Sequence, residues 1–367
     1  MKKNLIIASV LLLTSARYVF AATGFGFDTH FSPTGSNLSY TDLTANADIL
    51  AANGQSWIRF DFWSWDITPS GTPTTINWTN LAYFDQAVNY ARGKGLKVMI
   101  VTAVPDFAKS YSLTDYLQVT KNFYSFLAGH FAGRVTVWQV FNEADSHNFR
   151  DYTPITSLSA SYLAELNQVL SEARSAIKAE DPAALVSTNA SGYPVNDQTQ
   201  ATWFAYFDAI GSNLDFLTVD LYPDVNNVLP EVAQFADRVR AVENRYNKPV
   251  AVGETGICTR SPYFSEQSQA TLLPQYINAL KPASPKMILV YEVQDENNNP
   301  DDCEGSFGIR RFDGTEKPAF ATVMAAMRLI PGDLNGDGRV DILDLRQLLS
   351  QFTNIFDYNL VAGNFGK

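Results

Sequence analysis

Two kinds of hydrophobic pattern alternate along most of the chain. Short, almost wholly apolar runs such as 97–104 are typical of parallel strands buried on both faces, whereas segments such as 113–130 repeat apolar residues at helical spacing. Predicted strands cover 24–30, 55–63, 97–104, 135–143, 184–189, 215–223, 249–254 and 286–295. Predicted helices cover 40–53, 81–92, 113–130, 159–179, 231–247, 267–280 and 318–329.

This alternation predicts an α/β fold, a closed (β/α)8 TIM barrel. The main alternative is a doubly wound open sheet. That fold usually carries a glycine-rich phosphate-binding turn after its first strand, and no GxGxxG is present. In a barrel the active site forms at the C-terminal ends of the strands, so polar residues at those positions are the first functional candidates.

Two predicted strands end in a glutamate. The strand 135–143 ends in Asn142 and Glu143, and the strand 249–254 ends in Glu254. In a barrel both would face one pocket as paired carboxylates. Glycoside hydrolysis needs such a pair: one acid protonates the leaving oxygen while the other handles the anomeric carbon. The surroundings of the two acids must therefore separate their pKa values.

Other polar residues are predicted at the same strand ends. Asn142 is placed to orient a substrate beside Glu143, Arg59 to keep Glu254 ionised, and Tyr222 to donate a hydrogen bond to Glu254. Taken singly, each of these residues is equally consistent with a structural role. His30 and His147 are further candidates for sugar contacts, with a plain rim or loop position as the alternative for each.

Composition narrows the class of ligand. The formal net charge of the 367 residues is −11 and no basic run occurs in the body of the chain, which argues against nucleic acid or an anionic membrane as a partner. Aromatic residues make up 13% of the chain, and they suit a site that stacks on sugar rings as well as a large aromatic core. The expected partner is a carbohydrate substrate.

The N-terminus has the features of a secretory signal. A basic start is followed by the apolar stretch 5–13 and by small residues near Ala21, so residues 1–21 are expected to be removed on export. A retained anchor is the alternative. No other stretch is apolar enough to cross a membrane, and the mature protein is expected to be secreted, extracellular or associated with the cell surface.

The composition changes near residue 331. Loop positions 1, 3, 5, 7, 9 and 12 of an EF-hand-type calcium loop are filled by Asp333, Asn335, Asp337, the Arg339 carbonyl, Asp341 and Asp344. Gly338 stands at position 6, where the loop must turn sharply. A second, partial repeat 13 residues on lacks its own loop, so one structural Ca²⁺ is expected in a small helical module over 331–367, and no cofactor is expected for catalysis.

The strand-end motifs resemble those of clan A glycoside hydrolases. They are Trp138–Glu143, Val252–Gly256, Trp57–Asp61 and Asp220–Pro223, and the segments 291–295, 305–308 and 317–320 are most similar to the family 39 and related family 5 branches. The resemblance implies a catalytic domain over 22–330, with Glu143 as general acid/base and Glu254 as nucleophile. It also implies retention of anomeric configuration, which requires carboxyl groups about 5–5.5 Å apart.

One position departs from the clan pattern. Many members have a tryptophan under the sugar at the end of the eighth strand, but this chain has Tyr291 there, so either Tyr291 or a loop tryptophan such as Trp63 or Trp65 is expected to supply the platform. The C-terminal module resembles a type I dockerin with one intact and one truncated repeat. That resemblance implies a cohesin-type scaffold protein as a candidate partner, with an anchoring or spacing module as the alternative.

The chain has two cysteines, Cys258 and Cys303. An even pair in an exported protein is expected to form a disulfide, which in a barrel would join two loops on the rim of the active site. The combined hypothesis is a secreted, retaining β-glycoside hydrolase acting on a xylan, mannan or β-glucan type of substrate. A non-catalytic carbohydrate-binding barrel and a transglycosylase using the same two glutamates are the alternatives.

Overall fold

The computed structural model describes residues 23–32, 38–62, 64–68, 76–104, 108–192, 196–260, 264–299, 301–328, 340 and 342. Its strands are β1 (Gly24–Thr29), β2 (Trp57–Phe62), β3 (Lys97–Thr102), β4 (Val137–Val140), β5 (Leu185–Ser187), β6 (Asn189–Ala190), β7 (Leu217–Asp220), β8 (Val250–Glu254) and β9 (Met287–Val290). Its α-helices are α1 (Tyr40–Ala52), α2 (Ser64–Ile67), α3 (Trp78–Gly93), α4 (Leu113–His130), α5 (Ala160–Glu180), α6 (Asp197–Ile210), α7 (Val228–Val232), α8 (Phe235–Tyr246), α9 (Glu266–Leu280) and α10 (Ala319–Ala326).

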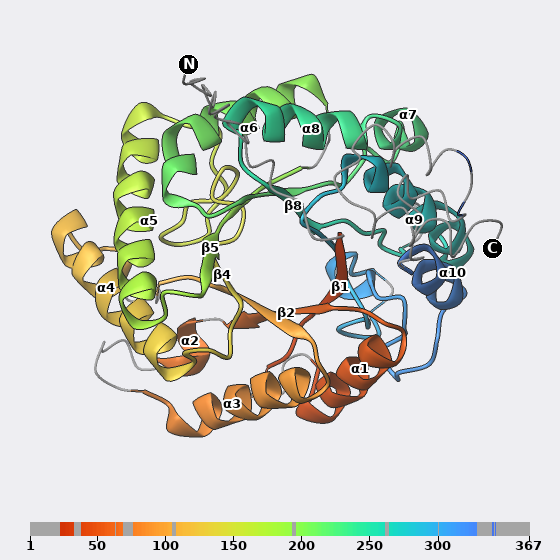
Figure 1. Cartoon of the computed structure of the whole chain (residues 1–367), viewed down its shortest axis with the longest axis horizontal. Helices are drawn as coiled ribbons and strands as arrows, with labels where there is room; N and C mark the ends of the chain where they lie inside the picture. Colours follow the sequence, from red (N-terminus) through yellow and green to blue (C-terminus); the bar gives the residue numbers. More distant parts are fainter. Residues whose placement is uncertain are drawn as a thin grey trace, which may run out of the picture.

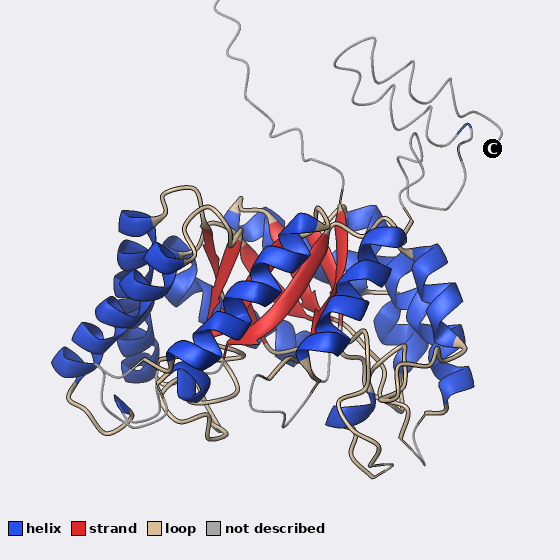
Figure 2. Ribbon diagram, turned by 90° about the horizontal axis from the view of Figure 1, so that it is seen from below, coloured by secondary structure: helices blue, strands red, loops and turns tan. Residues whose placement is uncertain are grey.

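The nine strands form one parallel, nearly closed barrel in the order β5-β4-β3-β2-β1-β9-β8-β7-β6. Only Thr188 separates β5 from β6, so the two ends of this order are two halves of one strand. Counted in this way, the barrel has eight strand positions, which is consistent with a (β/α)8 TIM barrel. Helices surround the strands on the outside, as Figure 1 shows along the barrel and Figure 2 from the side.

Two apolar clusters hold the barrel together. A large one lies between the strands and the surrounding helices, and a small one fills part of the barrel interior with Trp57, Met99, Val137, Phe216, Ala251, Met287 and Leu289. Side chains two residues apart on a strand share a face, so Arg59 points into the same interior as Trp57, nearer the C-terminal end of β2. The barrel interior therefore has an apolar layer near the N-terminal ends of the strands and a polar layer near their C-terminal ends.

The hydrophobic pattern located most elements correctly, but it missed the short helix α2, and the following elements also differ from the prediction. Helix α6 was not predicted: its first turn is polar, and the Asn196 side chain caps it by accepting hydrogen bonds from two backbone amides. The predicted helix 231–247 is divided into α7 and α8. Strand β4 stops at Val140 because Phe141 and Glu143 have positive φ values, which a strand residue does not adopt.

Several sequence predictions lie outside the described residues. They are the signal segment 1–21, Trp63, the Trp65 side chain and the calcium ligands between 333 and 344. The elements of the barrel run from Gly24 to Ala326. Among the helices that the structure describes, none has the length and apolar character needed to cross a membrane.

The disulfide expected from the sequence is present. Cys258 follows β8 and Cys303 lies in the loop after β9, and these two strands are neighbours in the barrel. The bond therefore joins two adjacent loops at the C-terminal end of the barrel, 45 residues apart in the chain.

Removing this disulfide should lower stability. A Cys258→Ser/Cys303→Ser double variant is expected to lose about 2–4 kcal/mol of unfolding free energy, because the cross-link restricts a long loop in the unfolded chain. Denaturant titration of the variant beside oxidised and reduced wild type measures the loss. Rapid alkylation of both cysteines in unreduced, folded wild type would contradict the bond.

Candidate active site

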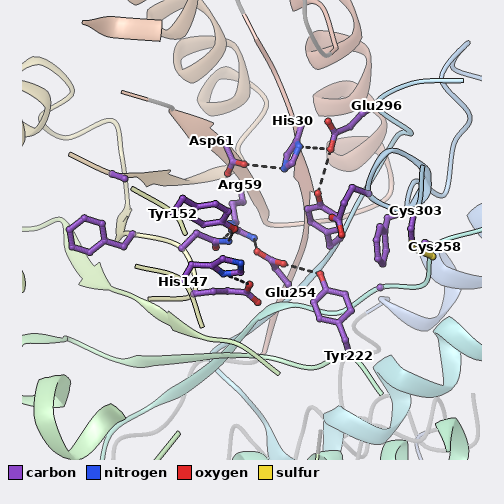
Figure 3. Close-up of a pocket in the computed structure, with 18 of the residues that line it drawn as sticks. His30, Arg59, Asp61, His147, Tyr152, Tyr222, Glu254, Cys258, Glu296 and Cys303 are labelled. Carbon is purple, nitrogen blue, oxygen red and sulfur yellow. Dashed lines mark hydrogen bonds and ion pairs between the residues drawn. A yellow bond between two sulfur atoms is a disulfide. The ribbon is translucent and has the colours of Figure 1, made fainter. Parts of the chain in front are cut away.

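A cavity of about 1180 Å³ opens at the C-terminal end of the barrel, lined by strand ends and the loops that follow them. It brings together every site residue that the sequence named within the described barrel: His30, Arg59, Asn142, Glu143, His147, Tyr222, Glu254, Tyr291, Cys258 and Cys303. Figure 3 shows most of these side chains converging on Glu254. The barrel order predicted from the sequence is what makes these distant segments neighbours.

Glu254, the last residue of β8, is held by two donors. Arg59 Nη1 lies 2.6 Å from Oε1, and the Tyr222 hydroxyl donates to Oε2 at 2.8 Å. A carboxylate that accepts one charge-assisted and one neutral hydrogen bond is stabilised in its ionised form and fixed in orientation. The contacts that the sequence proposed for Arg59 and Tyr222 are therefore present.

Arg59 is the cation at the centre of the site. It is only 1% exposed, and Nη1 also lies 2.7 Å from Asp28 Oδ2 on the neighbouring strand β1. Burial raises the pKa of Asp28 to about 7, although the charge of Arg59 lowers it. Asp28 and Glu254 therefore share one buried guanidinium.

Asn142 has a fixed amide orientation. Its Oδ1 accepts hydrogen bonds from Arg59 at 3.2 Å, from Gln139 at 3.1 Å and from Asn189 at 2.8 Å. Because the oxygen is occupied by these donors, Nδ2 is turned the other way and donates to the Tyr152 hydroxyl at 3.4 Å. The sequence pointed to Asn142, but it had no signal for Gln139 and Asn189, which lie at strand ends without an adjacent acid.

Glu143 has the opposite electrostatic environment. No arginine contacts its carboxyl group among the described residues, and its nearest basic group is His147 Nδ1, 3.9 Å from Oε2. Burial raises the pKa of Glu143 well above its ordinary range, and the charges of Glu254 and Asp145 raise it further. Its backbone amide donates to Asn189 Oδ1 at 2.8 Å, which helps to hold the positive-φ turn.

His30, at the end of β1, connects two further acids. Its Nε2 lies 3.0 Å from Asp61 Oδ2 and its Nδ1 lies 2.5 Å from Glu296 Oε1, as Figure 3 shows. Burial opposes the charged ring, but Asp61 and Glu296 raise the pKa of His30 well above its ordinary value. The sequence pointed to His30 as a candidate and to Asp61 only as the last residue of the Trp57–Asp61 motif, whereas Glu296 lies in a loop and carried no signal.

Two overlapping groups of side chains have donor atoms of the metal-binding type. They are Asp28, His30 and Asp61, and His30, Glu292 and Glu296. Both groups share His30, whose two ring nitrogens are already paired with Asp61 and Glu296. The side chains therefore form a cluster of ion pairs, and the His30 nitrogens are not free to bind a metal ion.

Tyr291 forms an aromatic side of the cavity. Its ring meets His30 edge to face at 5.3 Å and Phe307 at 5.1 Å, and its hydroxyl lies 3.4 Å from Glu296 Oε1. These contacts hold the ring in one orientation. The role of sugar platform that the sequence assigned to Tyr291 or a loop tryptophan stays a prediction.

The loop between β4 and α5 supplies a second aromatic pair. The rings of His147 and Tyr152 are stacked, with centroids 4.4 Å apart and planes 8° from parallel. Burial lowers the pKa of His147, so the ring is neutral at neutral pH, and Nδ1 lies 2.8 Å from the Ser146 hydroxyl. Sequence reasoning missed Tyr152, since one tyrosine in a polar loop has no distinguishing pattern.

The comparisons with known proteins agree with this geometry. Residues 118–285 match glycosyl hydrolase family 53. A search of curated proteins found no match. The family match includes Glu143 and Glu254 and covers a little under half of the chain.

Three solved structures illustrate the fold that this chain shares with other proteins. A family 39 glycoside hydrolase from Bacteroides cellulosilyticus WH2 has a TM-score of 0.63 and 16% identity over 84% of this chain and 64% of that one, so this chain spans less than two thirds of it. A GH5_18 protein from Streptomyces cattleya, in complex with Manb1-4GlcNAc, has a TM-score of 0.64 and 17% identity over 84% and 80%. Xylanase 10B from Thermotoga maritima has a TM-score of 0.61 and 16% identity over 83% and 95%.

These comparisons say what the chain is similar to. Its segment 118–285 is similar to glycosyl hydrolase family 53, and its barrel has the fold of the solved structures named above. The similarity to the solved structures, at 16–17% identity, concerns the fold.

Proposed function

We propose that the protein cleaves β-linked polysaccharides or oligosaccharides by double displacement, with Glu254 as nucleophile and Glu143 as general acid and base. The observation that carries this assignment is the electrostatic contrast between the two acids. Glu254 accepts hydrogen bonds from Arg59 and Tyr222, whereas burial and nearby negative charge keep the proton on Glu143. A nucleophile must be ionised and a general acid protonated at the same pH.

In the first step, a Glu254 oxygen attacks the anomeric carbon and the bond to the leaving oxygen breaks. Glu143 gives its proton to that oxygen, so the leaving sugar departs as a neutral alcohol and a glycosyl ester remains on Glu254. In the second step, Glu143, now ionised, takes a proton from water as the water oxygen attacks the same carbon. The ester bond breaks, Glu254 returns as a carboxylate, and two inversions give net retention.

The neighbouring side chains have defined parts in this scheme. Arg59 and Tyr222 orient the Glu254 carboxylate through their hydrogen bonds, and the outward Nδ2 of Asn142 can donate to a sugar hydroxyl beside the anomeric carbon. Burial is the main cause of the raised pKa of Glu143, and the loss of negative charge on Glu254 in the first step removes a second cause. Glu143 can then lose its proton more easily, and it needs to be ionised in the second step.

The experiment that tests the proposal is a panel of β-linked backbones of xylose, mannose, glucose and galactose, with reducing-end release as the readout. We expect hydrolysis of one backbone or a small group of them. Longer sugars instead of shorter products would favour a transglycosylase, which shares the first step. Binding without bond cleavage would favour a non-catalytic carbohydrate-binding barrel and would overturn the proposal.

For the two ends of the chain we propose export directed by residues 1–21, and a Ca²⁺-stabilised, dockerin-like module over 331–367. The support is the sequence pattern: an apolar segment after a basic start, and oxygen ligands at the spacing of a calcium loop. A cohesin-type scaffold protein is the candidate partner of this module, and a spacer between barrel and surface is the alternative.

Removal of calcium should destabilise the C-terminal module and leave the activity of the barrel largely unchanged. Chelation is expected to increase protease cleavage within 333–367 while changing kcat/KM of the barrel by less than about twofold, because none of the ligands proposed for Ca²⁺ is among the residues proposed for catalysis. Limited proteolysis and an activity assay, each with EDTA and with Ca²⁺ restored, measure both effects. Complete loss of activity on chelation would contradict the division at residue 331.

A further inference from the structure

The loop between β4 and α5 places an aromatic surface next to the proposed acid. His147 Nδ1 lies 3.9 Å from Glu143 Oε2, and the Tyr152 ring is stacked on His147. Both rings line the cavity. Tyr152 is 51% exposed, so the stack on His147 leaves much of its surface open to solvent.

Local hydrogen bonds hold this loop in one conformation. The His147 amide donates to the Glu143 carbonyl at 2.9 Å, the Asn148 amide to Thr153 at 2.7 Å, and the Tyr152 amide to Asn148 at 2.8 Å. Tyr152 itself has φ of 56°, a left-handed conformation that is uncommon for a residue with a side chain and persists where surrounding contacts enforce it. The loop therefore presents the ring in a fixed position instead of packing it into the core.

The position of this aromatic surface relative to Glu143 and Glu254 indicates which of the two sugars at the cleaved bond it would contact. Figure 3 shows His147 and Tyr152 on one side of Glu254, with Tyr222 and the disulfide on the other. The acid must reach the oxygen between the two sugars that are being separated. An aromatic surface on the acid's own loop, away from Tyr222, borders the sugar that leaves with that oxygen.

From this geometry we infer that Tyr152, supported by His147, is the platform of a leaving-group subsite that binds a pyranose ring by stacking. The inference rests on the proposed function of Glu143 and Glu254. An aromatic ring with a polar edge offers an apolar face to the C–H groups of a sugar while its hydroxyl stays hydrogen-bonded. The Tyr152 hydroxyl is anchored in this way by Asn142 Nδ2 at 3.4 Å. Tyr152 is thus a specificity-determining residue for substrates that extend past the cleaved bond.

The test compares two substrates of the sugar that wild type hydrolyses in the backbone panel: a linear oligosaccharide, and the β-fluoride of its disaccharide. Fluoride leaves without a ring, so it cannot use the subsite. Tyr152→Ala is expected to lower kcat/KM about tenfold on the oligosaccharide and less than about twofold on the fluoride. Tyr152→Phe keeps the ring and should lose clearly less kcat/KM on the oligosaccharide than Tyr152→Ala does.

Tyr83→Ala is the matched control, since Tyr83 is 39% exposed on α3 and does not line the cavity. The basic limb of the pH profile should be unchanged in Tyr152→Ala, which separates stacking from an effect on the Glu143 proton. Equal losses on both substrates, or no loss on either, would overturn the subsite. A wild type that hydrolyses neither substrate would instead overturn the proposed function, and the subsite with it.

Discussion

Replacing Glu254 by glycine is expected to lower kcat on a β-linked oligosaccharide by roughly 10⁴-fold or more, the scale seen when a nucleophile is removed from a catalytic group that acts as a unit. The substitution removes the oxygen that would form the ester. The Arg59 guanidinium keeps Asp28 as a partner at 2.7 Å, so no unpaired buried charge is created and the barrel should remain folded. Steady-state kinetics and a thermal unfolding scan measure the two effects.

Azide gives this prediction a specific control. In Glu254→Gly, azide can enter the vacated space and attack the anomeric carbon of an activated aryl β-glycoside, and the aryl group departs as phenolate. One inversion gives an α-glycosyl azide. In Glu254→Gln the amide still fills the space, so azide should restore little activity. Full activity of either variant without azide would show that Glu254 is not the nucleophile.

Replacing Glu143 by glutamine is expected to lower kcat/KM by about 10²–10⁴-fold on substrates with a sugar leaving group, because that oxygen needs a proton to depart. A 2,4-dinitrophenyl glycoside leaves without one, so the loss in the first step should be much smaller on that substrate. The isosteric amide keeps the volume of the side chain in its cavity. Comparison of the two substrates with the same variant separates lost acid catalysis from misfolding.

The pH profile of wild type gives an independent check on Glu143. Burial and the charges of Glu254 and Asp145 raise its pKa well above the ordinary value, so the proton is retained as pH rises through the usual range of a glutamic acid. Activity should therefore persist at neutral pH and fall only as pH passes the raised pKa of Glu143 and the acid form is lost. The basic limb should be absent from Glu143→Gln. A basic limb unchanged in that variant would assign the titration to another group.

Most of the barrel and its two glutamates could be predicted from hydrophobic periodicity and from the polar residues at the ends of predicted strands. Apolar strands buried on both faces are typical of parallel sheets covered by helices, and their regular alternation with helices predicted a barrel. The doubly wound sheet was the alternative, and the chain lacks the glycine-rich phosphate-binding turn typical of that fold. Glu143 and Glu254 were found because each ends a predicted strand, and the contacts predicted for Arg59 and Tyr222 follow from the same barrel order. These features depend on the local hydrophobic pattern and on the order of the strands along the chain, and both can be read from the amino-acid sequence.

The tertiary structure decided the environment of each group. Which glutamate retains its proton depends on how many donors and charges surround it in space, and Arg59 reaches Glu254 from 195 residues away. Gln139 and Asn189 orient Asn142, and Glu296 pairs with His30, through contacts between loops and strand ends that no periodic pattern encodes. Tyr152 belongs to the same class: its place beside Glu143 arises from a turn closed by its own hydrogen bonds.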